Sequence, residues 1–338
     1  FGHPKGLGLL FVVEMWERFS YYGMRALLVL YLVNHLEWSD GDAARLYGTY
    51  TGLVYLTPLI GGYLADQLIG TRRSLVIGSI IITLGHFLLA FEPMTTFYAG
   101  LLCIVVGTGF FKPNVSTMVG QIYREGDPRR DAGFTIFYMG INLGAFMAPL
   151  ACGALAQNDN FGWHYGFALA GVGMLLGLIT YLWGRNKYLP GIGVGTNKDK
   201  PSSNVDTAGS ETNGAPLIPG VVGAIIGAGL TLLGGASILP VAMAAAAGAL
   251  VGICIFGTRG EERKRVTALF IIVFFTVFFW MAFEQAGSSM NLFADRYTNL
   301  NIGNFEMPSS WFQSVNALAI LIFAPIFAGI WVWLNKRG

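Results

Sequence analysis

The chain alternates long apolar stretches with short polar ones from end to end. Its apolar runs have the length, about 20 residues, that a helix needs to cross the hydrocarbon core of a membrane. The predicted spans are residues 7–36, 46–68, 74–91, 97–122, 132–156, 163–183, 217–239, 240–257, 266–293 and 311–334. The pattern therefore predicts an all-α polytopic membrane protein.

Composition and charge agree with this interpretation. Of the 338 residues, 54% are hydrophobic and 12% are charged, whereas soluble domains carry about a quarter charged residues. Most of the 21 Lys and Arg residues fall in alternate connections, and only Arg45 and Arg296 are expected on the opposite side. The positive-inside rule then places the N-terminus in the cytoplasm. Because Glu14 interrupts the first run, we expect this run to be retained as a helix.

The first predicted span carries an unusual set of charges, Glu14, Glu17, Arg18 and Arg25. A charge at the centre of a bilayer costs about 2.5–3.5 kcal/mol, so such residues persist where they face a protein interior. At about 100° per residue, three of these charges and Tyr21 share one narrow face of a helix. The span is therefore predicted to turn a polar face toward other helices.

The order of the spans predicts four parts of the chain. Residues 1–184 form an N-terminal six-helix bundle, and residues 185–216, rich in Gly, Ser, Asn and Lys, form a cytoplasmic linker. Residues 217–257 form an accessory hairpin in which small residues let two helices approach closely. Residues 258–338 supply two further helices.

Short motifs carry a resemblance to a known family. Residues 14–22, EMWERFSYY, resemble the E-x-x-E-R-F-x-Y-Y motif of the proton-coupled oligopeptide transporters, a branch of the major facilitator superfamily. Residues 110–114 (FFKPN), 137–144 (FYMGINLG) and 279–285 (FWMAFEQ) resemble further motifs of that family, in the family's order. Residues 66–73 (DQLIGTRR) are similar to the loop signature of the superfamily.

The resemblance implies the fold and the function. The expected fold is that of the major facilitator superfamily, with a six-helix N-terminal bundle, two accessory helices and the first part of the C-terminal bundle. Because the family has twelve core helices, the last four are expected to be absent from this chain. The expected protein is a multi-pass monomer of a bacterial plasma membrane. Its expected partners are di- and tripeptides and the lipid bilayer, with the proton as coupling ion and no cofactor, metal or nucleic acid.

A short peptide is a zwitterion with variable side chains, so its site needs fixed charges and tolerant walls. Arg25 and Lys112 suit the C-terminal carboxylate, since a guanidinium pairs in bidentate fashion and an ammonium adds a point charge. The alternative is that Arg25 only neutralises Glu284 so that the bundle can fold. The resemblance implies further substrate contacts from Tyr22, Tyr55, Asn142, Trp280 and Asn316. For Asn316, an ordinary hydrogen bond between helices is the alternative.

Proton coupling is expected to rest on carboxylates, because the position that matches a histidine of mammalian members is Gly48 here. Glu284 is the expected proton carrier, alternately released and recaptured by Arg25. The expected coupling network beside Lys112 is Glu14, Glu17 and Arg18. A permanently closed salt-bridge cluster is the structural alternative for this network.

Two charges predict a gate on the external side. Arg45 lies at the start of the second span, and Asp295 ends the seventh. We expect them to pair and to hold the two bundles together when the site opens inward.

Two other classes of function compete with peptide transport. A relative of the same fold that moves another anion, such as nitrate or a glucosinolate-like solute, or that exports drugs, is expected to lack the charged set of residues 14, 17 and 18, which is intact here. A membrane enzyme or receptor is disfavoured, because the sequence shows no nucleophile with a base, metal-ligand cluster or phosphate-binding loop.

Overall fold

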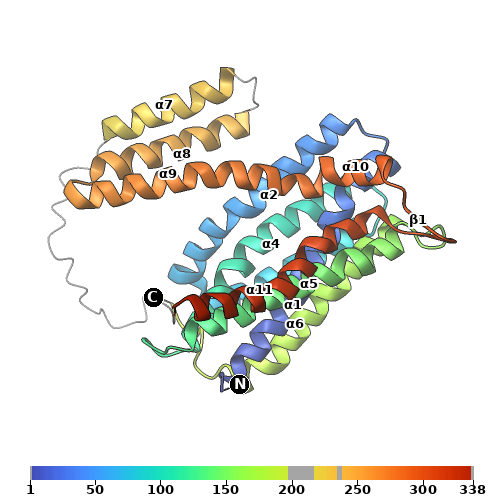
Figure 1. The fold of residues 1–338 in the computed structure, drawn as a ribbon, viewed down its shortest axis with the longest axis horizontal. Helices are drawn as coiled ribbons and strands as arrows, with labels where there is room; N and C mark the ends of the chain where they lie inside the picture. Colours follow the sequence, from blue (N-terminus) through green and yellow to red (C-terminus); the bar gives the residue numbers. More distant parts are fainter. Residues whose placement is uncertain (1, 197–216, 234–237, 336–338) are drawn as a thin grey trace. The chain divides into compact units, whose positions relative to one another are not determined.

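The computed structural model describes residues 2–196, 217–233 and 238–335. Its helices divide into two compact units. One unit contains residues 1–202 together with residues 285–338, and the other contains residues 203–284. Each unit is described by itself (Figure 1).

The first unit is an antiparallel helical bundle. Its helices are α1 (Lys5–Leu30), α2 (Asp40–Leu64), α3 (Thr71–Leu89), α4 (Met94–Gln121), α5 (Arg130–Ala156) and α6 (Trp163–Tyr188). Two π-helical turns extend α1 and α2, namely η1 (Tyr31–His35) and η2 (Ala65–Ile69). The chain returns to this unit in α10 (Ser289–Tyr297), a hairpin of β1 (Asn301–Ile302) and β2 (Phe305–Glu306), η5 (Ser309–Gln313) and α11 (Ser314–Asn335). The predicted six-helix bundle is therefore present.

Helix α1 lies at the centre of this unit and packs along α5 and α6, as Figure 1 shows. Small residues on the neighbours permit the close approach that helix packing in membranes favours. A Cβ atom on Gly144 of α5 would lie 2.9 Å from the backbone nitrogen of Phe19 on α1. Most residues of α1 are buried as a result, and they include four of its charged residues.

Helices α2 and α4 approach each other as closely at Gly61. A Cβ atom at this position would lie 2.9 Å from the backbone nitrogen of Phe110 and closer still to the carbonyl of Gly109. We expect Gly61→Ala to destabilise the protein by about 1–3 kcal/mol, because the backbones must separate. Gly48→Ala on the same helix is the matched control, since nothing lies within 4 Å of its Cβ position. Thermal unfolding in detergent measures both, and equal melting temperatures for the two variants would contradict the packing.

The turn between α2 and α3 contains the motif at residues 66–73 that resembles a superfamily loop signature. Gly70 has a φ of +85°, which a glycine adopts readily, and it ends η2. Arg72 then donates from Nε to the carbonyl of Ile192 at 2.6 Å and also to the carbonyl of Leu189. These bonds satisfy carbonyls that follow the end of α6. Of the predicted linker, residues 185–188 belong to α6, residues 189–196 are held against α3, and residues 197–216 lie outside the described part.

The second unit contains the accessory hairpin and α9. Helices α7 (Leu217–Leu233) and α8 (Ile238–Gly257) pack where Gly223 faces Gly248, and α9 (Gly260–Phe283) follows. The predicted continuous seventh span is wrong in one respect. The helix stops at Phe283 and passes through the 3-10 turn η4 (Glu284–Gly287) before α10 begins. The sequence Gly287-Ser288-Ser289 explains the interruption, because glycine and serine are weaker helix formers than alanine or leucine.

In the described part of the chain, six helices are long and apolar enough to cross a membrane: α3, α4, α5, α6, the stretch Gly260–Gly287 and the stretch Ser309–Trp331. Helix α1 carries five charged residues, the exposed Lys5 and four buried ones, and so falls outside this set, although it is as long as its neighbours. The apolar portions of α7 and α8 are shorter, at Pro219–Gly229 and Ala244–Gly257.

Candidate functional site

Four charged side chains in the middle of α1 turn inward. The exposed fractions are 3% for Glu14, 1% for Glu17, 5% for Arg18 and 5% for Arg25. This confirms the prediction that the polar face of the first span lies inside the protein. Charges buried to this degree require partners, because an isolated one pays a large desolvation cost.

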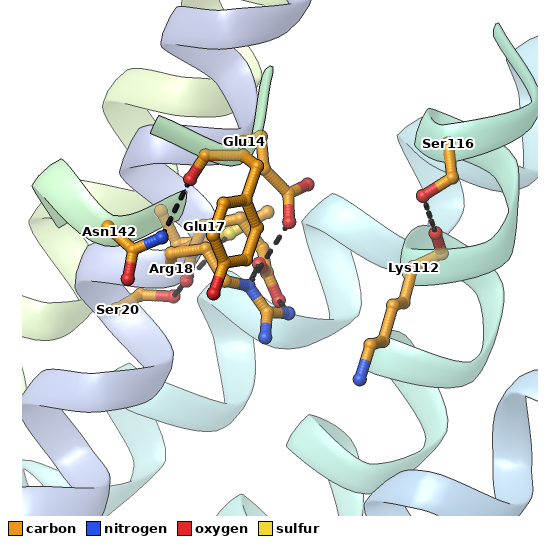
Figure 2. Close-up of polar contacts among 9 residues, drawn as sticks. Glu14, Glu17, Arg18, Ser20, Lys112, Ser116 and Asn142 are labelled. Carbon is orange, nitrogen blue, oxygen red and sulfur yellow. Dashed lines mark hydrogen bonds and ion pairs between the residues drawn. The ribbon is translucent and has the colours of Figure 1, made fainter. Parts of the chain in front are cut away.

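Arg18 is the centre of the cluster that Figure 2 shows. Its guanidinium donates two hydrogen bonds to the carboxylate of Glu17, through Nε and one terminal nitrogen. The same Nε lies 3.3 Å from Oε1 of Glu14, one helical turn away. The other carboxylate oxygen of Glu14 is buried without a hydrogen-bond partner among the described residues. One arginine thus faces two acids, and Glu14 is the less strongly held of them.

Lys112 extends from the neighbouring helix α4. Its ammonium lies 4.5 Å from the centroid of the Tyr55 ring on α2, within the range of a cation–π interaction. Lys112 is half-buried, and Tyr55 is 48% exposed. The structure therefore brings two of the predicted substrate-binding residues together on α2 and α4.

Arg25 lies two turns beyond Arg18 on α1. Its Nε donates to the hydroxyl of Tyr47 on α2 at 2.7 Å, and its Cζ lies 5.7 Å from the centroid of the Tyr22 ring. Tyr22, a predicted ligand, thus borders the guanidinium that is expected to hold the peptide carboxylate.

The two predicted asparagines differ in burial. Asn142 on α5 is 5% exposed and donates to the carbonyl of Tyr138 at 2.9 Å, as Figure 2 shows. Asn316 is an exposed residue of α11, and α11 packs on α5, where Ser314 donates to the carbonyl of Phe146 at 2.8 Å. Both asparagines therefore lie on helices that contact each other.

Trp280 and Glu284 belong to the second unit. Trp280 is 45% exposed near the end of α9, and Glu284 opens η4 as a half-buried residue. The expected approach of Glu284 to Arg25 stays a prediction.

The structure corrects the predicted gate. Arg45 lies 3.3 Å from Asp42 of its own helix, where the two residues are three positions apart on one face. The ion pair between the segments is instead formed by Arg296 of α10, which makes two hydrogen bonds of 2.7 Å to Asp40. The start of α2 and the end of α10 therefore meet as expected, but α2 supplies the acid and α10 supplies the arginine.

Further polar contacts seal α10 and η5 against α1 and α5; we call this set of contacts the α10 seam. The buried amide of Asn291 donates to the carbonyl of Ala26 at 2.9 Å. Other bonds of the seam join Asn34 to Asp295 at 2.9 Å and Ser310 to Gln157 at 2.9 Å. The end of the unit where α1 stops and α2 starts is therefore closed.

We expect Arg296→Gln to open the α10 seam modestly. The pair is partly exposed, and exposed pairs contribute about 0–1 kcal/mol, which corresponds to at most about a fivefold change in population. The hydrogen bonds from Arg296 lower the pKa of Asp40 below its ordinary value of 3.8. The pair therefore stabilises the closed seam fully above pH 3.8, and this stabilisation is lost as the pH falls through the lowered pKa of Asp40. Spin labels on the outer turns of α2 and α10 report the separation. Arg45→Gln is the control, and an equal shift in both variants would contradict the assignment.

The sequence did not single out Tyr47, Asp40 or Asn291. Tyr47 is one of 14 tyrosines, and its spacing does not distinguish it from the others. Asp40 and Arg296 are visible as charges at helix ends, but their pairing depends on how two distant helices align. One feature of the sequence pointed to Arg296: it is one of only two basic residues expected on the external side.

The chain is similar to known membrane transporters in both sequence and structure. The model of the POT family (PTR2) matches residues 72–338. The peptide transporter YePEPT of Yersinia enterocolitica is 40% identical over the whole chain, which covers 69% of that protein. The di-/tripeptide transporter of Lactococcus lactis is 36% identical, again over the whole chain and 70% of the relative. A crystal structure of a mutant of the peptide transporter POT in complex with alafosfalin has a TM-score of 0.79 at 38% identity, covering 100% of this chain and 70% of the other.

The membrane-crossing helices, the buried charges and the similarity to a peptide transporter structure identify a secondary transporter with the major facilitator superfamily fold. The chain belongs to the POT family of that superfamily.

Proposed function

We propose that the protein is a proton-coupled symporter that imports di- and tripeptides across a bacterial plasma membrane. The observation that carries the proposal is the buried cluster in which Arg18 faces both Glu17 and Glu14. Relatives named as peptide and di-/tripeptide transporters support the substrate class. The cluster supports the coupling, because intramembrane acids next to basic residues are typical of proton pathways.

The substrate site that we propose uses residues of the N-terminal helices and one aromatic residue of α9. Arg25 and Lys112 provide positive charge for the peptide carboxylate, and Asn142 offers an amide to the peptide backbone. The aromatic rings of Tyr22, Tyr55 and Trp280 supply apolar walls, which suit side chains of varied shape.

We place the N-terminus in the cytoplasm, because the basic connections lie on that side of the bundle. The α10 seam then lies on the external side, and the closed seam corresponds to an inward-facing state. Peptide release to the cytoplasm is followed by opening of the seam, as the two bundles rock about the central site. We propose that a monomer performs this cycle.

Uptake of labelled dialanine by the complete transporter in proteoliposomes tests the proposal. With an inward proton gradient we expect accumulation above the external concentration. Without the gradient we expect uptake only to equality. Equal uptake under both conditions would show an uncoupled carrier, and no uptake would exclude peptide transport. Competition by nitrate, but not by dipeptides, would favour a carrier of other anions.

A further inference from the structure

A tyrosine outside the family motifs holds the guanidinium of Arg25. Tyr47 is 3% exposed on α2, and its hydroxyl accepts the hydrogen bond from Nε of Arg25 at 2.7 Å. The Cζ atom of Arg25 lies 5.9 Å from the centroid of the same ring. A charge-assisted bond of this kind is about twice as strong as a neutral one and fixes the plane of the guanidinium.

The tyrosine also packs closely against Gly287, the buried last residue of η4. A Cβ atom on Gly287 would lie 2.6 Å from Cζ of Tyr47 and closer still to its hydroxyl oxygen. Gly287 does not have a positive φ, so the conformation alone does not demand glycine here. Glycine is required here because a side chain would occupy the space of the Tyr47 hydroxyl.

Gly287 is positioned by its connection to α10. This helix follows two residues later, and Asn291 in its first turn donates to the carbonyl of Ala26, the residue next to Arg25. The backbone of α1 beside Arg25 and the hydroxyl that holds Arg25 are therefore both in contact with the same short segment. Movement of α10 away from α1 would release both contacts together.

We propose that Tyr47 is a positioning residue for Arg25, and that Gly287 keeps the room that Tyr47 needs when the α10 seam is closed. The proposal rests on the proposed function, in which Arg25 binds the peptide carboxylate. Tyr47 does not touch the substrate. It orients the guanidinium and ties this orientation to the docking of α10.

Tyr47→Phe in the complete transporter tests the proposal. The substitution removes the hydroxyl and keeps the ring, so we expect the apparent KM for dialanine to rise about tenfold, with the maximal rate changed less than about twofold. Uptake of dialanine amide, which lacks the carboxylate, is expected to stay unchanged. The preference for the acid over the amide therefore falls by about the same factor of ten.

Tyr50→Phe is the matched control. Tyr50 lies one turn along α2, is equally buried, and its hydroxyl has no hydrogen-bond partner in the described residues. We expect its removal to leave the acid-to-amide preference unchanged. If Tyr47→Phe and Tyr50→Phe change this preference equally, Tyr47 does not position Arg25.

Two further variants separate the possible failures. Gly287→Ala is expected to lower the acid-to-amide preference as Tyr47→Phe does, because the added methyl displaces the hydroxyl. Arg25→Ala is expected to abolish the preference. If Arg25→Ala retains the preference, the proposed role of Arg25 fails. If Arg25→Ala loses the preference while Tyr47→Phe keeps it, the positioning role alone is overturned. Should Gly287→Ala fail to fold, the comparison of the two tyrosine variants decides.

Discussion

Glu284→Gln is expected to abolish proton-driven accumulation of dialanine while peptide exchange continues. A glutamine has nearly the shape of a protonated glutamate, but it cannot release a proton. In the proposed cycle, protonation of Glu284 frees Arg25 for the peptide carboxylate, and deprotonation recaptures Arg25 and favours release. The glutamine variant is therefore fixed in the condition that corresponds to protonated Glu284, with Arg25 free for the peptide carboxylate. It therefore binds peptide and exchanges labelled for unlabelled dialanine across the membrane, because this exchange moves no net proton.

The measurement compares two assays on one preparation of proteoliposomes. Counterflow of labelled dialanine is expected at about the rate of the parent protein, and accumulation under an inward proton gradient is expected to fall to the level without a gradient. Glu262→Gln is the control, since Glu262 is an exposed acid in the first turn of α9. If Glu284→Gln still concentrates dialanine, the transported proton is carried elsewhere, with Glu14 and Glu17 as the next candidates.

Lys112→Ala is the second substitution with a large expected effect. Its ammonium contacts the Tyr55 ring, and Lys112 is half-buried, so we expect a change in stability of about 1 kcal/mol or less. Transport should respond much more strongly. Without this charge, accumulation of dialanine against its gradient is expected to disappear.

The control for this variant lies one turn along α4. Ser116 is exposed, and its hydroxyl donates to the carbonyl of Lys112 at 3.4 Å, as Figure 2 shows. Ser116→Ala is expected to retain both uptake and melting temperature. A Lys112→Ala protein that no longer purifies as a monodisperse species would instead assign Lys112 a structural role.

Much of the fold could be predicted from the sequence, because lipid imposes simple rules on a spanning helix. Every apolar run predicted as a span contains a helix in the described part of the chain. The seventh span was wrong at its end, since a window of apolar residues does not register the weak helix formers around Gly287. The charges of α1 were predicted to lie inside the protein from their cost in lipid, and they do.

The candidate site was less predictable. Helical spacing places Glu14 next to Arg18, and the structure has this pair. Spacing within one helix does not determine which residue of another helix lies opposite, so the hydrogen bond from Arg25 to Tyr47 was not predicted. The same limit explains the gate, where Arg45 pairs locally and Arg296 reaches Asp40. The contact of Glu284 with Arg25 stays a prediction.

The coupling of peptide to proton movement is tested most directly by driving protons with peptide alone. The complete transporter is reconstituted with a pH-sensitive dye inside, at equal pH on both sides, and dialanine is added outside. The symport account predicts acidification of the lumen on addition of dialanine, and none on addition of an impermeant sugar. Entry of labelled dialanine without any change in internal pH would contradict it.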